Sequence, residues 1–284
     1  MTEPSFRHIS ARDGTRLMVR DWAANTKVPR RATVFCLSGI TRNGKDFSRL
    51  ADDLAARGSR VFALDYRGRG GSDRAADAES YTPQVYLDDI RAVLAALNLH
   101  RVAVIGTSLG GFMAMAMAVA MPGAIAGAVI NDAGPNIPAG QTTRFVDYVS
   151  GTPDFATWDE AEAACRSMLP DMNLEDHEWR IVADGSFREE GGRIVPDWDA
   201  RIAVPLRRAG AIPDLWPLFR ALTPFPTLAI RGGLSKLLTQ ECFDKMAAVH
   251  PNLRRITIEN RGHAPTLDEP ISREAIHDFL AAIT

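Results

Sequence analysis

The sequence predicts an α/β protein with a mostly parallel central sheet, covered by helices on both faces, and an inserted helical segment. Short apolar strands alternate with amphipathic helices over residues 32–130 and again over residues 227–283. Between about residues 134 and 223 this alternation stops. Strands that are apolar throughout are typical of a parallel sheet that is buried on both faces.

The chain begins with two alternating runs, around residues 6–10 and 15–22. The dipeptide Asp13-Gly14 lies between them. An Asp-Gly pair between alternating segments predicts a β-hairpin.

The first series of alternating elements follows this hairpin. Predicted strands cover residues 32–37, 61–64, 102–105 and 125–130, and predicted helices cover residues 47–57 and 109–120. A further helix begins at Thr82-Pro83, because Thr offers an N-cap and Pro fits the first helical position. The uncharged stretch 102–131 does not predict a membrane span, since Pro122 and several glycines interrupt it.

The inserted segment contains three amphipathic helical pieces, residues 158–168, 174–183 and 214–222, separated by Pro- and Gly-rich breaks. The core pattern then resumes with strands at 227–230 and 254–258 and helices near 240–249 and 271–283. We therefore expect one core, formed by residues 1–133 and 223–284, and a helical insertion formed by residues 134–222.

Composition limits the kinds of partner. The 284 residues are 46% hydrophobic and carry a formal net charge of −2, so no overall field attracts nucleic acid or an anionic membrane. A small-molecule substrate is expected instead, bound by a monomer or homodimer. Cys36, Cys165 and Cys242 form no C-x-x-C pair, which argues against a zinc or redox site and favours a cytoplasmic protein without a signal segment.

Ser108 is the candidate nucleophile. The motif Gly106-Thr107-Ser108-Leu109-Gly110 directly follows a predicted strand and opens a helix, which is the context of the G-x-S-x-G nucleophile elbow. The sharp turn leaves no room for side chains two positions to either side of the serine. The alternative is a Gly-rich turn that binds a phosphate, but the G-x-G-x-x-G and G-K-[ST] forms are absent.

A serine nucleophile needs a base within hydrogen-bond reach. His263 lies in a loop directly after the last predicted strand, at the sheet edge where open α/β sheets bind ligands. The other histidines are interpreted as ordinary surface or capping residues. No H-x-H or H-E-x-x-H pattern occurs, so a metal hydrolase is disfavoured and no metal or cofactor is expected.

With these motifs the chain resembles the α/β-hydrolase fold family over essentially its whole length. Residues 37–40, Leu-Ser-Gly-Ile, are similar to the family's oxyanion segment, and residues 65–72 are similar to its D-x-R-G-x-G-x-S loop. Ser38 stands where many relatives have His. The resemblance implies that the backbone amides of Ile40 and Leu109 form the oxyanion hole, and that the insertion is a cap over the site.

Two positions in the sequence could supply the acid of the implied Ser-His-Asp triad. Relatives commonly carry an Asp shortly after the strand at 227–230, where this chain has Ser235. Some take the acid from the end of the strand that follows the nucleophile helix, where Asp132 lies. We predict Asp132 as the residue that orients His263. The alternatives are that Asp132 only starts a turn, or that the acid is Asp268 or Glu269, which we interpret as helix N-terminal charges.

These residues predict a cofactor-independent serine hydrolase that cleaves an ester or related acyl bond through an acyl-enzyme. An apolar or aromatic substrate would be bound by tryptophans of the insertion, although tryptophans at helical spacing also build a cap's own core. The candidates are Trp158, Trp179 and Trp216, together with Met168, Met172, Phe155 and Phe187. Candidates for pairing a substrate carboxylate are Arg144, Arg207 and Arg208.

Three further functions stay open. The resemblance leaves open that the protein is a carbon–carbon bond hydrolase of aromatic degradation or a cofactor-free perhydrolase, since both use the same triad. A slow-turnover ligand-binding protein on the same fold is the third. Dehalogenases and epoxide hydrolases of the family are excluded, because they carry Asp where this chain has Ser108.

Overall fold

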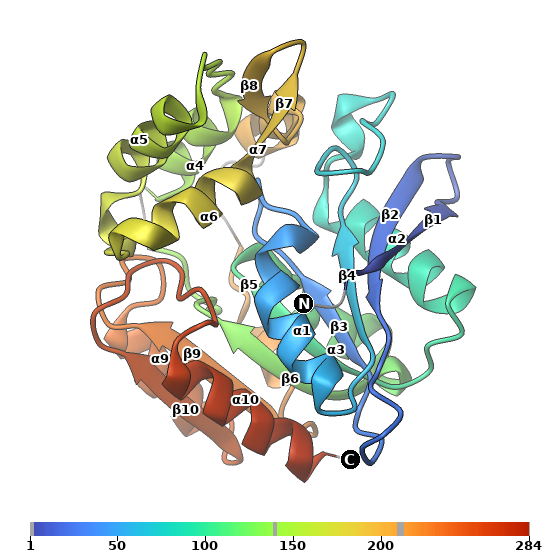
Figure 1. Ribbon diagram of the computed structural model, residues 1–284. Helices are drawn as coiled ribbons and strands as arrows, with labels where there is room; N and C mark the ends of the chain where they lie inside the picture. Colours follow the sequence, from blue (N-terminus) through green and yellow to red (C-terminus); the bar gives the residue numbers. More distant parts are fainter. Residues whose placement is uncertain (1–2, 139–140, 209–212, 284) are drawn as a thin grey trace.

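A computed structural model describes residues 3–138, 141–208 and 213–283. Its main sheet has eight strands in the order β1-β2-β4-β3-β5-β6-β9-β10, and these are parallel except for the β1–β2 and β2–β4 pairs (Figure 1). The strands are β1 Ser5–Ser10, β2 Arg16–Trp22, β3 Val34–Leu37, β4 Val61–Asp65, β5 Val102–Thr107, β6 Ile125–Asn131, β9 Thr227–Gly232 and β10 Leu253–Ile258. The predicted, mostly parallel sheet is confirmed.

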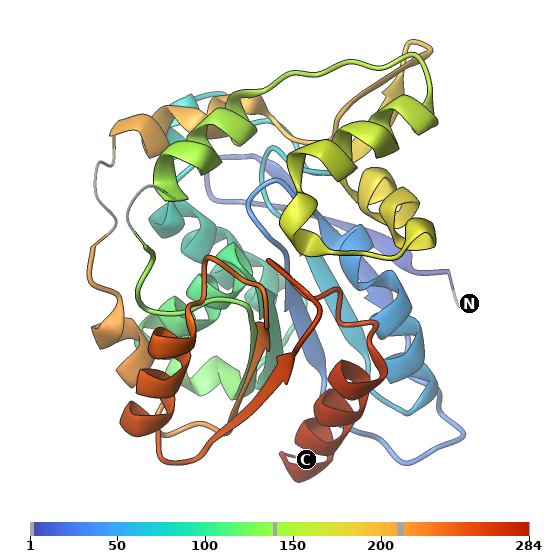
Figure 2. The same cartoon turned by 90° about the vertical axis from the view of Figure 1, so that its left-hand side faces the viewer.

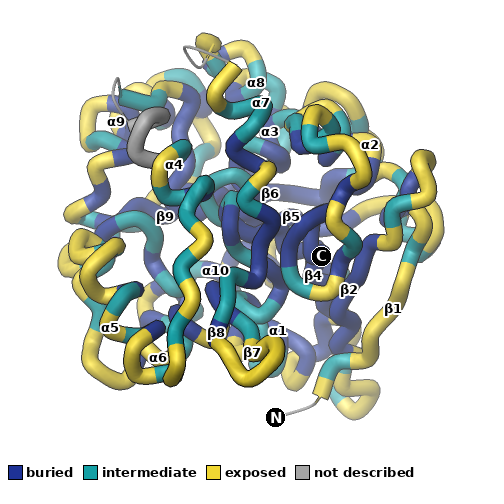
Figure 3. Tube along the Cα trace, turned by 90° about the horizontal axis from the view of Figure 1, so that it is seen from above, coloured by how far each residue is buried: buried dark blue, intermediate teal, exposed yellow. Residues whose placement is uncertain are grey.

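The first two strands form the predicted hairpin. β1 and β2 pair antiparallel, and Gly14 in the turn has φ +85°, a conformation that side chains with a Cβ rarely adopt. β1 is exposed at the edge of the sheet, whereas β2 is buried between β1 and β4 (Figure 3).

Helices cover both faces of the sheet, as Figure 2 shows from the side. The core helices are α1 Ser48–Ala56, α2 Pro83–Ala96, α3 Leu109–Ala120, α9 Gln240–Val249 and α10 Pro270–Ala282. Leu54 of α1 and Phe279 of α10 pack with Cys36 on one face, whereas Val93 of α2 and Phe35 belong to the core on the other face together with α3 and α9. Neighbouring residues of β3 therefore point to opposite faces, as the two-residue period of a strand requires.

Short 3₁₀ helices connect several elements: η1 Gly44–Phe47, η2 Ala78–Ser80, η3 Pro122–Ala124, η4 Pro170–Met172 and η5 Ala200–Ile202. The predicted cap of α2 is confirmed, because the Thr82 side chain accepts a hydrogen bond from the Val85 N–H at 3.4 Å. Within the described ranges, no helix is long and apolar enough to cross a lipid bilayer.

The segment between β6 and β9 forms a group of elements beside the sheet (Figure 1). It contains α4 Gln141–Ser150, α5 Trp158–Met168, α6 Asp176–Ser186, the antiparallel pair β7 Phe187–Glu190 and β8 Arg193–Pro196, and α7 Ala203–Arg208. The sequence did not predict the β7–β8 hairpin. Its turn is formed by Gly191 and Gly192, both with positive φ, and this Gly-Gly pair was a hairpin signal in the sequence.

The last helix of this segment belongs to the core by its contacts. α8, Trp216–Arg220, packs against α3, and the Lys245 Nζ of α9 lies 4.5 Å from the centre of the Trp216 ring. α8 thus contacts core helices although the predicted insertion, residues 134–222, includes it, and the boundary at residue 223 stays a prediction. The role of the preceding elements as a cap stays a prediction.

Candidate active site

Ser108 lies on the tight turn between β5 and α3. Its φ of 51° and ψ of −113° are unusual for a residue with a side chain, and its N–H donates to the Asn131 carbonyl at 3.0 Å. A Cβ on Gly106 would lie 2.2 Å from the Gly110 carbonyl oxygen, and one on Gly110 would lie 1.9 Å from the Leu37 carbonyl oxygen. The motif thus has the strand–turn–helix context expected from the sequence, and the glycines are required by close backbone contacts.

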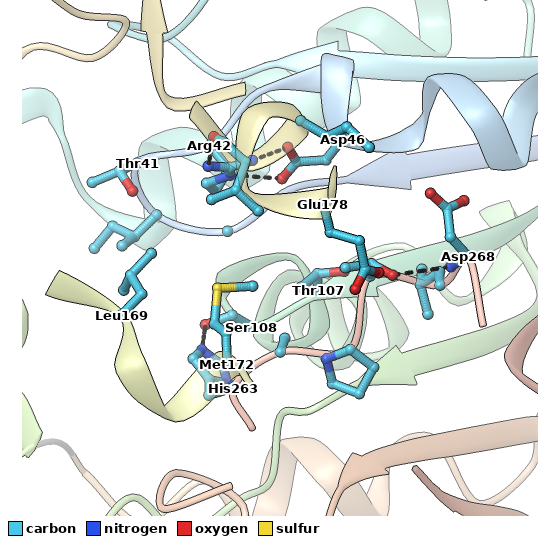
Figure 4. Close-up of a pocket in the computed structure, with 18 of the residues that line it drawn as sticks. Thr41, Arg42, Asp46, Thr107, Ser108, Leu169, Met172, Glu178, His263 and Asp268 are labelled. Carbon is cyan, nitrogen blue, oxygen red and sulfur yellow. Dashed lines mark hydrogen bonds and ion pairs between the residues drawn. The ribbon is translucent and has the colours of Figure 1, made fainter. Parts of the chain in front are cut away.

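The structure brings together Ser108, His263 and Asp132 from three separate parts of the chain. His263 Nε2 lies 3.0 Å from Ser108 Oγ, and His263 Nδ1 lies 2.7 Å from Asp132 Oδ2 (Figure 4 shows the first contact). The Asp132 side chain is fully buried, whereas His263 is 24% exposed. A base between a hydroxyl and a buried carboxylate is the arrangement that activates a serine nucleophile.

Asp132 directly follows β6 and has a left-handed backbone conformation, with φ +48°. Its Oδ1 accepts a hydrogen bond from the Gly232 N–H at 2.9 Å, and its Oδ2 accepts one from the Ser235 hydroxyl at 2.6 Å. A buried carboxylate needs such donors, because its charge is otherwise costly away from water. Ser235, at the position of the acid in many relatives, therefore contacts the carboxylate that Asp132 supplies from the neighbouring strand.

The two alternative acids lie in other interactions. Asp268 accepts a hydrogen bond from Arg273 at 2.7 Å and lines the cavity described below. Glu269 precedes α10 and accepts hydrogen bonds from the Thr266 N–H and the Ser272 hydroxyl, both at 2.9 Å. Both acids therefore lie at the N-terminal end of a helix, which agrees with the interpretation made from the sequence.

The two residues predicted to supply the oxyanion donors, Ile40 and Leu109, belong to segments near Ser108. Leu109 is the first residue of α3, so its N–H has no partner within the helix. Ile40 lines the cavity beside Ser108, and its carbonyl accepts a hydrogen bond from Arg69 Nε at 2.8 Å. Ser38 connects the two segments, because its carbonyl oxygen accepts a hydrogen bond from the Gly110 N–H at 3.0 Å.

A cavity of about 270 Å³ opens at Ser108 and His263 (Figure 4). Its apolar lining residues include Ile40, Met168, Leu169, Met172, Ile181 and Val182. One cavity wall carries an ion pair, in which Arg42 Nε donates to Asp46 Oδ2 at 2.9 Å. Burial acts to lower the pKa of Arg42, but the Asp46 carboxylate outweighs it and the pKa is raised, so Arg42 stays charged.

The structure does not bring the predicted tryptophans into the lining of this cavity. Trp158 stacks with Arg180 of α6, and Trp179 stacks with Arg166 of α5. Trp216 belongs to α8, which packs on α3, and it lies beside Lys245 of α9. This cavity therefore does not support the predicted substrate contact of the three tryptophans, which stays a prediction. The tryptophans build the helix packing and surface stacking of their own elements, which was the alternative considered from the sequence.

The other predicted binding residues divide in the same way. Met168 and Met172 line the cavity, whereas Phe155 and Phe187 pack against each other with their ring centres 5.3 Å apart. The arginines face other partners: Arg207 donates to the Ser150 hydroxyl, Arg208 pairs with Glu79, and the Arg144 side chain lies outside the described residues.

Several lining residues were missed from the sequence. Thr41 and Arg42 directly follow the oxyanion segment, and this position was a signal that they would lie near Ser108. Tyr148 of α4 had no such signal, because only the fold of the insertion brings it to the cavity. Among the described residues, no group of three or more His, Cys, Asp or Glu side chains is placed to hold a metal ion.

Known proteins that are similar to this chain include α/β hydrolases, in agreement with the arrangement of Ser108, His263 and Asp132. A family model described as the alpha/beta hydrolase fold matches residues 32–150. The 3-hydroxybutyrate-oligomer hydrolase of Cupriavidus necator is 30% identical over 268 residues, covering 90% of this chain and 89% of that protein. The chain belongs to the α/β-hydrolase fold family.

Two further proteins show the extent of the similarity. The crystal structure of an alpha/beta hydrolase from Novosphingobium aromaticivorans is 39% identical, with a TM-score of 0.91 and 99% of each chain covered. The 2-(acetamidomethylene)succinate hydrolase of Mesorhizobium japonicum is 27% identical over 246 residues, covering 86% of both chains. All three of these proteins are described as hydrolases, and the predicted fold and family are confirmed.

Proposed function

We propose that this protein is a serine hydrolase that cleaves esters of small acyl groups through an acyl-enzyme. The observation that carries the proposal is the hydrogen-bonded series Ser108, His263 and Asp132, which opens onto a mostly apolar cavity. This series supplies the nucleophile, the base and the group that orients the base.

The proposed reaction has two halves. His263 Nε2 takes the Ser108 proton as Oγ bonds to the ester carbonyl carbon, and the N–H groups of Ile40 and Leu109 stabilise the oxyanion. The carbon–oxygen bond then breaks, and the leaving alcohol takes the proton from His263. A water, deprotonated by His263, then attacks the acyl carbon, the bond between that carbon and Ser108 Oγ breaks, and His263 returns the proton to Oγ as the acid leaves. Asp132 keeps the proton of neutral His263 on Nδ1 and stabilises the imidazolium.

The cavity limits the size of the substrate. At about 270 Å³ it lies just below the range of roughly 300–1,000 Å³ that is typical of pockets for drug-sized ligands, which supports a short acyl group. The similarity to a 3-hydroxybutyrate-oligomer hydrolase supports short esters of hydroxy acids as the first natural substrates to test.

The experiment compares wild-type protein with Ser108→Ala on p-nitrophenyl esters of increasing chain length and on 3-hydroxybutyrate dimers and trimers. We expect turnover by the wild type, loss of turnover in the variant, and labelling of Ser108 alone by a fluorophosphonate. Turnover retained by Ser108→Ala, or a label on another serine, would contradict the proposal.

A carbon–carbon bond hydrolase is the second candidate. The 2-hydroxymuconate semialdehyde hydrolase of a Pseudomonas species is 36% identical over 110 residues, 38% of each chain, and supports this candidate. Ring-cleavage dienoates hydrolysed faster than every ester would favour it. Tight stoichiometric binding with negligible turnover would instead favour a ligand-binding protein. The cytoplasmic location and the oligomeric state stay predictions.

A further inference from the structure

The buried Ser235 hydroxyl donates its hydrogen bond to the Asp132 carboxylate. Ser235 is buried, with 7% of its surface exposed, in the loop that follows β9. Its Oγ accepts hydrogen bonds from the N–H groups of Leu237 and Leu238, each at 3.2 Å. With its acceptor capacity used in this way, the hydroxyl proton is donated to Asp132 Oδ2 at 2.6 Å.

The oxygen that Ser235 contacts is the one that His263 contacts. Asp132 Oδ2 lies 2.7 Å from His263 Nδ1, while Oδ1 accepts the Gly232 N–H at 2.9 Å. The Ser235 N–H in turn donates to the Gly232 carbonyl at 2.9 Å, so both donors to the carboxylate belong to one closed turn. A carboxylate held at both oxygens by one turn cannot rotate without breaking a hydrogen bond.

We propose that Ser235 is a positioning residue that, with the Gly232 N–H, holds Asp132 Oδ2 on His263 Nδ1. The inference rests on the proposed function, because it assigns Ser235 a role in the same proton transfer. When His263 takes the Ser108 proton, the carboxylate that stabilises the imidazolium is already in place. A preorganised acceptor of this kind lowers the barrier without needing to contact the substrate.

The test measures kcat and KM of Ser235→Ala with p-nitrophenyl butyrate. Hydrogen bonds to charged groups are strong enough that kcat should fall by about 10- to 100-fold. KM should stay within about twofold, because Ser235 is not among the residues described as lining the cavity. Ser235→Thr, which keeps the hydroxyl, should retain most of the wild-type kcat.

A matched control removes another buried serine hydroxyl that donates to a carboxylate. Ser272 Oγ donates to Glu269 Oε2 at 2.9 Å and is fully buried. Ser272→Ala should leave kcat unchanged although it loses a comparable hydrogen bond. If Ser235→Ala does not fold, Ser235→Cys keeps a weak donor of similar shape and should have a lowered kcat with an unchanged KM.

A double-mutant cycle separates a positioning role from a general structural one. If Ser235 acts through Asp132, then Ser235→Ala should change kcat by less than about twofold in an Asp132→Asn background. An equal loss in both backgrounds, or a wild-type kcat in Ser235→Ala, overturns the inference. If Asp132→Asn or Ser108→Ala is itself fully active, the proposed function fails instead, so the two failures are distinguishable.

Discussion

Replacing Asp132 by Asn tests the proposed site, because it exchanges one carboxylate oxygen for an NH₂ group and changes little else. The Asp132 carboxylate accepts from the Gly232 N–H at Oδ1 and from the Ser235 hydroxyl at Oδ2, where His263 Nδ1 also lies at 2.7 Å. The introduced amide has one oxygen and one NH₂ group, so it cannot accept at both positions. The Gly232 N–H is a fixed backbone donor, whereas the Ser235 hydroxyl can rotate its proton away from the introduced amide and His263 can move its proton from Nδ1 to Nε2. We therefore expect the NH₂ group to face His263.

That orientation favours the tautomer of His263 with its proton on Nε2, beside Ser108, where it cannot take the serine proton. The same exchange in Ser-His-Asp proteases lowers kcat by about 10⁴, which corresponds to about 5.4 kcal/mol. We expect a loss of that order in initial rates with p-nitrophenyl butyrate, a KM close to wild type, and an unchanged circular dichroism spectrum. A loss of less than tenfold in the folded variant would refute the reasoning.

The remaining predictions concern the elbow, a buried histidine and the link between the insertion and the core. Gly110→Ala should lower the free energy of unfolding by about 1–3 kcal/mol or more in urea, because its Cβ would lie 1.9 Å from the last carbonyl oxygen of β3; Gly123→Ala, with nothing within 4 Å, should be nearly neutral, and equal effects would contradict this. Burial lowers the pKa of His250, so the unfolded chain binds more protons than the folded protein below about pH 6.5. Stability should therefore fall as the pH drops from 7 to 5, and His250→Gln should show a smaller drop in melting temperature over that range; an equal drop would contradict the assignment. Arg261→Met should cost about 3–5 kcal/mol, because it leaves the Glu178 carboxylate without the pair at 2.7 Å, and hydrogen exchange should show faster opening of α6 and η4; unchanged exchange would show that this ion pair does not hold the insertion.

The elements that the sequence predicted best are those with local signals. α3, α5 and α9 begin and end at the predicted residues, 109–120, 158–168 and 240–249, because hydrophobic periodicity and capping are properties of neighbouring residues. The β7–β8 hairpin was missed because each of its strands has only four residues, and α4, residues 141–150, was also missed. The contact between α8 and α3 could not be predicted, because sequence adjacency does not show which helices pack together.

The sequence by itself determined the order of the core strands and helices, the elbow at Ser108 and the loop that carries His263, because each depends on residues within a few positions of one another. Only the tertiary structure decided how the distant parts meet. It brings the ends of β6 and β9 together, so that Ser235 donates to Asp132 across 103 positions of the chain. It also excludes the tryptophans from the cavity and brings Tyr148 to it. Such contacts depend on which faces of separate elements meet, and this information is not contained in any short stretch of the chain.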